Sequence, residues 1–552
     1  MKPQSQPSLP GYLTRFRLSV GLFFSLLGGV SSAAWAAGGP VGFDQIIPKP
    51  LTVVPSNGTF LIDKTVMLLS PGTAGADEAD LFGRLLFEKT GIALARRGKA
   101  PRTIKAEIDF NLPDSLGAEG YVINCTPTEL RVRSTTGNGL LLGLTSVAQA
   151  ASIGLIGAKA ELKCGDVADK PRFAYRGMHL DVCRHFYTVE EVKKYIDHLA
   201  YYKFNTFHWH LTDDQGWRIE ILKYPRLTTV GSKRAQTLIG HIRNTAKTYD
   251  GKPVSGFYTQ EQIRDVVRYA TARHITVMPE IEMPGHAQAA IAAYKWLGSN
   301  TDSVKVWDAW GYSPYIFNPN ERTMGFLRDV LTEVAGLFPS EFIHIGGDEA
   351  AKQHWKANAE VQTQIKILGL KDEEALQGWM LTEIEKHLAT LGKRMMGWDE
   401  IGSTGVSPTA AIMVWHNGNK SLNILQAGHE SVLSPGSHCY FDSYQADPRT
   451  VSQPLAIGGL TTLKTVYAFD PIPPGLTPEQ QGKVLGIQGN LWTEYIASFP
   501  KVQYMIFPRM LALAEVAWCP YGTKNYAAFK PRATLAFADL KRSGAQIGPV
   551  GE

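Results

Sequence analysis

Short apolar runs alternate with amphipathic segments from about residue 173 onwards. An apolar run of about four to eight residues is typical of a buried strand, and a periodicity of about 3.6 residues is typical of a helix. The alternation therefore predicts repeated βα units around a parallel sheet, and eight such units predict a closed (β/α)8 TIM barrel. The eight runs are residues 175–180, 206–211, 275–280, 342–345, 394–397, 411–415, 431–434 and 485–491.

Two helices of this region have recognisable starts. Thr188 with Glu191, and Thr259 with Gln262, have the spacing of a capping box, and apolar residues at helical spacing follow each pair. In a capping box the two side chains bond each other's backbone N–H groups, which fixes the first turn of the helix.

The pattern is different before the barrel. Short strands with two helices predict a smaller α+β domain without an ionisable cluster, which favours a structural role. We place the domain boundary in the polar stretch 165–172, so that residues 37–168 form the α+β domain and residues 169–552 the barrel. The expected strands are 59–69, 103–110, 120–125 and 129–132, and the expected helices are 76–89 and 139–151.

The first 36 residues have the pattern of a secretory signal peptide. Lys2, Arg15 and Arg17 precede an apolar run over 18–30, and Ala34-Trp35-Ala36 supplies small residues at a cleavage site. The run is shorter than the roughly twenty residues that a membrane span needs. We therefore expect cleavage of residues 1–36, a periplasmic or secreted protein, and no stable membrane anchor.

Charge and composition exclude other classes. The chain of 552 residues is 44% hydrophobic and 19% charged, which is ordinary for a globular protein. Its net charge of +5 falls to +2 when the three basic residues of the signal peptide are removed. No basic cluster with interleaved aromatic residues is present, so the sequence does not indicate a nucleic-acid partner.

The cysteine count argues against a disulfide framework. There are five cysteines and no C-x-x-C motif. One bridge is compatible with an oxidising compartment, and we expect it between Cys125 and Cys164, because both belong to the first domain.

Ionisable and aromatic side chains follow all eight barrel runs. Barrel enzymes build their sites from residues at the C-terminal ends of the strands, so this arrangement predicts a site there. In chain order these residues are Asp181, Arg184 and His185; His208, His210, Asp213 and Asp214; Glu280, Glu282 and His286; Asp348 and Glu349; Trp398, Asp399 and Glu400; Trp415 and His416; Tyr440 and Asp442; Trp492 and Glu494.

The adjacent carboxylates Asp348 and Glu349 are the centre of this prediction. They follow an apolar strand and two glycines, and burying such a pair is costly unless partners or chemistry compensate. Acidic residues are also common in the first turn of a helix. The tryptophans at neighbouring strand ends favour chemistry on a sugar, since their rings stack on the apolar faces of a pyranose while a carboxylic acid protonates the leaving group.

These segments resemble the family 20 glycoside hydrolases, the β-N-acetylhexosaminidases. The resemblance covers about residues 172–518, and the preceding domain is similar to the α+β domain found before the barrel of this family. The segments that carry it are YRGMHLDVCRHF (175–186), HWHLTDDQGWR (208–218), PEIEMPGH (279–286), HIGGDE (344–349), GWDE (397–400), YFD (440–442) and LWTE (491–494).

The resemblance implies exo-acting, substrate-assisted retaining hydrolysis of terminal β-linked GlcNAc or GalNAc, without a metal or cofactor. By position, Glu349 matches the general acid/base. Asp348 matches the residue that holds the acetamido N–H and stabilises the oxazolinium intermediate, and Tyr440 matches the hydroxyl that orients the acetamido oxygen. Further matches are the pocket walls Trp398, Trp415 and Trp492, the groups Arg176, Asp442 and Glu494 that bind sugar hydroxyls, and His286 with Asp213 or Asp214 behind the acid.

Two positions depart from the family pattern. Glu282 stands where an aspartate is usual. Residues 445–483 contain no tryptophan, although relatives often place one there as a platform for the next sugar, so Tyr467 or Phe469 is expected to replace it.

Two other functions fit parts of the sequence. His208 and His210, with Asp213 and Glu280, have the residue types of a Zn²⁺ site for metal-assisted hydrolysis. A non-catalytic sugar-binding protein is the third interpretation, although binding alone does not require a buried acid. The expected partner is an oligosaccharide or glycoconjugate that contains N-acetylhexosamine.

Overall fold

The computed structural model describes residues 39–300 and 303–552. The expected signal peptide lies outside the described residues. In the part of the chain that is described, no helix is both long and apolar enough to cross a bilayer.

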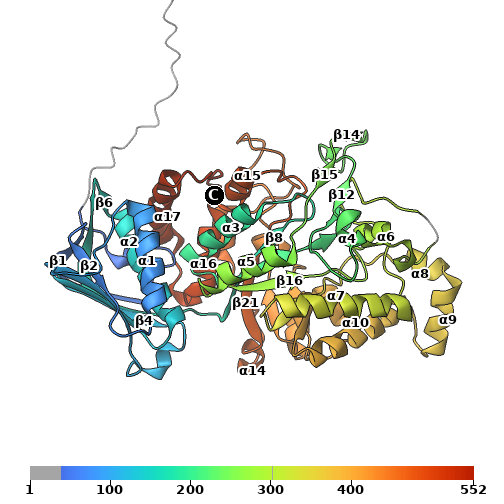
Figure 1. Ribbon diagram of the computed structural model, residues 1–552, viewed down its shortest axis with the longest axis horizontal. Coiled ribbons are helices and arrows are strands. Elements are labelled where there is room, and N and C mark those ends of the chain that lie inside the picture. The colour runs from blue at the N-terminus through green and yellow to red at the C-terminus, as the bar shows by residue number, and fades with distance from the viewer. Residues whose placement is uncertain (1–38, 301–302) are drawn as a thin grey trace, which may run out of the picture. The chain divides into compact units, whose positions relative to one another are not determined.

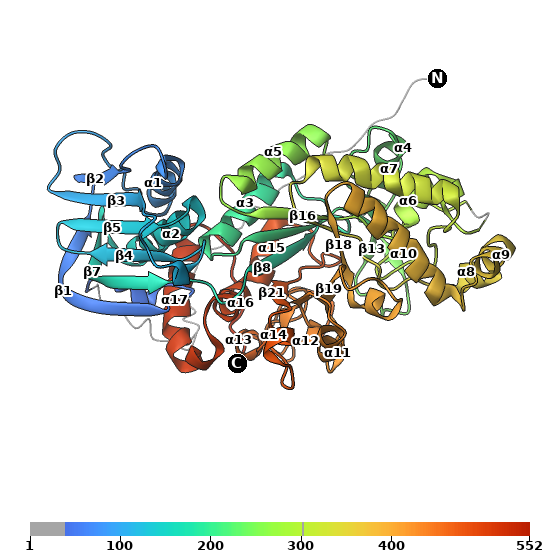
Figure 2. The same cartoon turned by 90° about the horizontal axis from the view of Figure 1, so that it is seen from below.

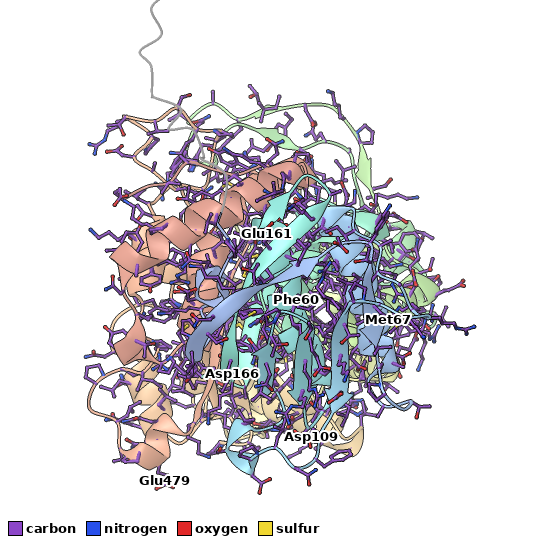
Figure 3. The ribbon with its side chains drawn as sticks, turned by 90° about the vertical axis from the view of Figure 1, so that its left-hand side faces the viewer. Phe60, Met67, Asp109, Glu161, Asp166 and Glu479 are labelled. Carbon is purple, nitrogen blue, oxygen red and sulfur yellow. The ribbon has the colours of Figure 1, made fainter. Side chains whose placement is uncertain are left out.

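The first domain is a seven-stranded sheet with two helices on one face (Figure 2). Its strand order is β1-β7-β4-β5-β3-β2, with β6 paired to β7. Buried and partly exposed residues alternate along the strands, as expected for a sheet with one face on a core. Figure 3 shows the molecule from the side on which this domain lies, with Phe60 labelled on β1 and Asp166 on β7. The elements are β1 (Thr52–Ile62), β2 (Val66–Leu69), α1 (Ala76–Thr90), β3 (Arg102–Ile108), β4 (Tyr121–Cys125), β5 (Glu129–Ser134), α2 (Gly137–Ile153), β6 (Leu155–Ile156) and β7 (Lys159–Asp169).

One strand prediction in this domain was wrong, and one strand was not predicted. The run 59–69 is two strands, β1 and β2, because the chain turns between them. The strand β7 was not predicted, and its last residues fall in the polar stretch 165–172 in which we place the domain boundary. Its side chains alternate between exposed and buried positions, so its polar residues occupy the open face of the sheet.

The expected bridge between Cys125 and Cys164 is absent. Cys125 lies opposite Gly165 in the β4–β7 ladder, which brings the two thiols together in the core, but all five cysteines are free. Burial raises the pKa of both thiols, which therefore pack as small apolar groups.

The second domain is a closed barrel of eight parallel strands, so the predicted fold class is confirmed (Figure 1). Each of the eight predicted runs is a barrel strand. The strands are β8 (Tyr175–Asp181), β9 (Thr206–His210), β16 (Thr276–Glu280), β17 (Phe342–His344), β18 (Arg394–Trp398), β19 (Ala411–Val414), β20 (Ser431–Leu433) and β21 (Val484–Gly489).

Helices surround the barrel, and both predicted capping boxes are present at the starts of α3 (Val189–Tyr201) and α5 (Gln260–Thr271). The other larger helices are α7 (Glu321–Leu337), α9 (Ala359–Ile367), α10 (Glu373–Thr390), α11 (Lys420–Gln426), α15 (Phe499–Ile506), α16 (Arg509–Trp518) and α17 (Tyr526–Arg542). Short elements are η1 (Phe43–Gln45), η2 (Asp114–Leu116), β10 (Thr212–Asp213), β11 (Gly216–Trp217), α4 (Arg226–Thr229), β12 (Lys233–Arg234), β13 (Leu238–Ile239), β14 (Thr248–Tyr249), β15 (Val254–Ser255), α6 (Gln288–Ala293), η3 (Lys295–Leu297), α8 (Gln353–Ala357), η4 (Asp399–Ser403), α12 (Gly436–Cys439), α13 (Leu463–Ala468), α14 (Pro478–Gln481) and η5 (Tyr521–Thr523).

A buried lysine joins the two domains at the N-terminal end of the barrel. Lys203 Nζ donates to Tyr121 Oη at 2.7 Å and lies 3.4 Å from Asp169 Oδ2. The same ammonium group lies 4.5 Å from the centre of a Trp518 ring, where the π-face attracts it. A charge buried among these partners holds the first domain against the end of the barrel that is opposite to the expected site.

Candidate active site

The carboxylate pair sits on a tight turn at the C-terminal end of β17. Gly346 and Gly347 both have positive φ, and a Cβ atom on Gly346 would lie 1.7 Å from Glu282 Oε2, so the turn requires glycine there. Asp348 is buried, whereas 38% of the Glu349 side chain is exposed. The turn thus holds one carboxyl group inside the barrel mouth and offers the other to solvent.

His286 connects this pair to a buried aspartate. Its Nδ1 donates to Asp213 Oδ1 at 3.1 Å, and its Nε2 lies 3.6 Å from Asp348 Oδ2 and 3.5 Å from Glu349 Oε2. Asp214 is farther from the same Nδ1, at 3.8 Å, and instead accepts the backbone N–H groups of Gln288 and Ser313. Of the two aspartates left open by the sequence, Asp213 is the hydrogen-bonding partner of His286.

Asp213 is the centre of a charged network. Its Oδ2 lies 2.9 Å from Arg184 Nη2 and accepts from His210 Nε2 at 2.8 Å. Burial favours the neutral acid, but Arg184, His286 and His210 outweigh it and hold the pKa of Asp213 below its usual range. Burial also disfavours a charged His286, yet Asp213 and Asp348 raise the pKa of His286 well above its usual value. His286 is therefore an imidazolium directed at the carboxylate pair.

Two other carboxyl groups in the site are shifted toward the neutral form. Burial raises the pKa of Asp348, with Glu400 and Glu349 adding to the rise and His286 opposing it. Burial, with Asp348 and Glu280 nearby, also raises the pKa of Glu282. The glutamate that departs from the family pattern is accommodated by the missing side chain of Gly346.

Aromatic residues stand at or just after the C-terminal ends of four barrel strands, the end of the barrel that carries Asp348. The rings of Trp398 and Trp492 are 5.9 Å apart, and those of Trp415 and Tyr440 are 6.1 Å apart and nearly parallel. Trp398 Nε1 donates to Glu280 Oε1 at 2.8 Å, and Trp415 Nε1 donates to Glu400 Oε2 at 3.1 Å. These hydrogen bonds fix the orientation of the indole rings.

Tyr440 is close enough to Asp442 and Asp348 for their charges to act on its phenol. Burial raises the pKa of its phenol well above the usual value, and the carboxyl groups of Asp442 and Asp348 add to the rise, whereas hydrogen bonds from Trp492 and Asn490 oppose it. The hydroxyl therefore keeps its proton and can donate it in a hydrogen bond.

Polar atoms without partners lie at the same end of the barrel. Asp348 Oδ1, Asp442 Oδ1 and Glu494 Oε2 are buried and have no hydrogen-bond donor in the described protein. Burial and Glu494 raise the pKa of Asp442 to about 8, and burial raises the pKa of Glu494 although Arg184 opposes it. Buried carboxyl oxygens normally have partners, so these atoms indicate a polar ligand.

The structure places one predicted sugar-binding residue, Arg176, away from the site, so this prediction is corrected. Arg176 is the second residue of β8, at the N-terminal end of the barrel, and its side chain is 1% exposed. Its guanidinium donates to both carboxylate oxygens of Glu119 in the first domain, at 2.6 and 2.8 Å, and to the carbonyl of Phe173. Arg184, beyond the other end of the strand, is the arginine that lies among the site carboxylates.

The expected replacements for the missing tryptophan are also elsewhere. The Tyr467 ring packs 4.6 Å from Phe529 of α17, and its hydroxyl accepts from Asn525 N. Phe469 is buried and stacks on His438. Neither ring is free to support a second sugar.

The histidines of the metal hypothesis form a buried network around Glu280. His208 Nε2, His210 Nδ1 and His344 Nδ1 all lie within about 3.1 Å of the Glu280 carboxylate. Two sets of side chains have ligand atoms close enough for an ion: His208, Glu280 and His344, and His179, His210 and Glu280. However, both ring nitrogens of His210 already face carboxylates. Burial opposes protonation, but Glu280 and Asp213 raise the pKa of His210 to about 10, which favours the protonated ring over one that binds a metal ion.

A parallel barrel with a carboxylate pair and an aromatic, carboxylate-lined pocket at its C-terminal face has the architecture of a glycoside hydrolase. The family model "Glycosyl hydrolase family 20, catalytic domain" matches residues 173–521, and the model of domain 2 of this family matches residues 44–170. The chain belongs to glycosyl hydrolase family 20.

Individual relatives agree with this assignment. The chain is 39% identical over 520 residues to a β-hexosaminidase of Porphyromonas gingivalis, covering 91% of this chain and 64% of the relative. It is 42% identical to a β-hexosaminidase of Vibrio furnissii, covering 63% of this chain and 57% of the relative. The chain thus spans less than two thirds of these two relatives. Among solved structures, an exo-β-N-acetylglucosaminidase of Vibrio harveyi in complex with N-acetylglucosamine is 30% identical, with a TM-score of 0.80 over 93% of this chain and 79% of that chain.

Proposed function

We propose that this protein is an exo-acting β-N-acetylhexosaminidase that removes terminal β-linked GlcNAc or GalNAc by substrate-assisted retaining hydrolysis. The observation that carries the proposal is the group of unpartnered buried oxygens on Asp348, Asp442 and Glu494 beside the aromatic walls. One sugar residue offers such a pocket both hydroxyl donors and an apolar ring face. The names of the relatives support the same activity.

In the first step, the carboxyl group of Glu349 gives its proton to the glycosidic oxygen. The acetamido carbonyl oxygen of the substrate attacks C1 while the bond from C1 to the leaving group breaks, which yields an oxazolinium ion. Asp348 accepts the acetamido N–H, and Tyr440 donates to the acetamido oxygen. His286 opposes the rise in the pKa of Asp348, which favours the carboxylate form that accepts this N–H and faces the developing positive charge.

In the second step, a water oxygen attacks C1 while the carboxylate of Glu349 takes a proton from that water. The bond from C1 to the acetamido oxygen breaks, which opens the oxazolinium ring, restores the acetamido group and gives overall retention. The His286 imidazolium lies close to both carboxyl groups. Arg184, Asp442 and Glu494 bind the ring hydroxyls, and Trp398, Trp415 and Trp492 surround the acetyl group and the ring.

The proposed compartment is the periplasm or the extracellular space. Its support is the basic, apolar and small-residue pattern of residues 1–36. The test is to express the full chain in a bacterial host and to measure the mass of the exported protein, which should begin at Ala37.

A substrate panel tests the activity. We expect hydrolysis of aryl β-N-acetylglucosaminide, aryl β-N-acetylgalactosaminide or both, and no comparable rate on the aryl α-anomers. Inactivity on both β-linked substrates would contradict the proposal.

The metal-dependent alternative predicts a different result in chelator. Because His210 is held as an imidazolium by two carboxylates, we expect full activity after treatment with EDTA. Loss of activity that Zn²⁺ restores would favour the alternative instead.

A further inference from the structure

The side chain of Glu349 is partly exposed, and the residue lines a cavity. This cavity has a volume of about 620 Å³ and is lined by Tyr312, Lys356, Glu374, Gln353 and Glu400, among others. A general acid has to reach the oxygen between the cleaved sugar and its leaving group, so the leaving group lies on the exposed side of Glu349. The cavity is therefore in the place where the leaving group must be.

Tyr312 is the only aromatic residue among the described residues that line this cavity. Its side chain is 50% exposed, and its ring centre lies 6.4 Å from that of His286 in an edge-to-face arrangement. A tyrosine half open to solvent presents an apolar face with a polar tip. That combination suits the ring face and hydroxyls of a pyranose.

The backbone around Tyr312 is anchored on both sides by buried residues of the site. Gln215 Nε2 donates to the carbonyl of Gly311 at 2.9 Å, and the N–H of Ser313 donates to Asp214 Oδ2 at 2.7 Å. Asp214 and Gln215 directly follow Asp213, the partner of His286. One short segment thus orients both the histidine behind the acid and the loop that carries Tyr312.

We propose that Tyr312 is the platform of the leaving-group subsite and determines the preference for a sugar as leaving group. The proposal rests on the proposed hydrolysis. It assigns this role to the loop after β16, in place of the segment 445–483, whose candidates Tyr467 and Phe469 are buried. The substrate class is an oligosaccharide with an uncharged pyranose next to the terminal N-acetylhexosamine, whose hydroxyls meet Gln353 and Glu374.

The test compares two leaving groups in four proteins. The substrates are N,N′-diacetylchitobiose, which leaves a sugar, and methyl β-N-acetylglucosaminide, which leaves methanol. The proteins are wild type, Tyr312→Ala, Tyr312→Phe and the control Tyr521→Ala. Tyr521 is equally exposed, at 49%, but lies on η5 after Trp518, which packs against the first domain.

We expect Tyr312→Ala to lower kcat/KM on the disaccharide by about tenfold and to change the methyl glycoside by less than about twofold. Tyr312→Phe keeps the ring and should resemble wild type on both, as should Tyr521→Ala. An equal loss on both substrates, no loss on the disaccharide, or a loss in Tyr312→Phe as large as in Tyr312→Ala would overturn the platform. A wild-type protein that cleaves neither glycoside would instead overturn the proposed function, and this inference with it.

Discussion

His286 Nε2 lies 3.5 Å from Glu349 Oε2, and both residues have positive φ, of 50° and 44°. Only four non-glycine residues of the described chain share this conformation, which costs free energy for a side chain with a Cβ atom. Strained backbone persists where the surroundings hold it, and functional sites are common examples. Here the strain places a cationic imidazole against the carboxyl group that has to exchange a proton, while Asp213 fixes the far side of the ring.

Replacement of Glu349 with glutamine tests the acid directly. Glu349→Gln keeps the size of the side chain but removes its proton, so we expect kcat on chitobiose to fall about 10²–10⁴-fold. The loss should be smaller for an aryl glycoside with a nitrophenolate leaving group, which departs without protonation. Thermal unfolding should be unchanged, because the side chain is partly exposed. A normal kcat on chitobiose would refute the assignment.

The two arginines of β8 and its following loop should affect different properties, Arg184 the activity and Arg176 the stability. Arg184→Lys breaks the forked contacts with Asp213 and Gln215, which lie near the carboxyl groups that we propose bind the sugar. We therefore expect kcat/KM to fall by at least about tenfold. Arg176→Lys loses the paired contact with Glu119 between the domains, so we expect a lower Tm with KM within about twofold of wild type. The measurements are steady-state kinetics and thermal unfolding of both variants. A large change of KM in Arg176→Lys would show that Arg176 does not have a purely structural role.

Asp442 should make stability depend on pH. In the unfolded chain the pKa of the Asp442 carboxyl is about 3.9. In the folded protein burial raises this pKa to about 8. Between these values the folded protein holds a proton that the unfolded chain has lost, so stability should fall as pH rises. We expect Tm to drop more between pH 5 and pH 7.5 in wild type than in Asp442→Asn, by roughly 1–3 °C. Equal drops in the two proteins would contradict the shift.

The barrel could be predicted from sequence because buried parallel strands are short, apolar and separated by capped helices. β7 was missed because its open face carries Lys159, Glu161 and Lys163, which hide the apolar pattern of a strand, and its last residues fall in the polar stretch 165–172. Arg176 was misassigned by similarity of motif, although its place near the start of β8 already indicated the structural end of the barrel. Tyr312 lies in a connection without regular structure, and no local pattern shows that Asp214 and Gln215 anchor it.

A fourth prediction concerns the atom that attacks. Since the proposed nucleophile belongs to the 2-acetamido group of the substrate, an aryl β-glucoside with a plain 2-hydroxyl offers none. It also leaves Asp348, Tyr440 and the tryptophan walls without the group they surround. We expect kcat/KM on the glucoside to be lower than on the N-acetylglucosaminide by on the order of 10⁴-fold.

The same argument fixes the behaviour of Asp348→Asn. If Asp348 stabilises the oxazolinium instead of attacking C1, Asp348→Asn should slow hydrolysis strongly, and neither protein should form a covalent glycosyl adduct. A thiazoline analogue of the cyclised intermediate should bind wild type far more tightly than substrate does, because it resembles the high-energy species. Asp348→Asn should lose most of this tight binding, since the asparagine carries no charge to face the ring cation. Mass spectrometry of both proteins during turnover, with inhibition constants for the thiazoline, measures these outcomes. A sugar trapped on Asp348 would mean that its carboxylate is the nucleophile. Equal thiazoline affinity in the two proteins would mean that the carboxylate lies outside the acetamido pocket.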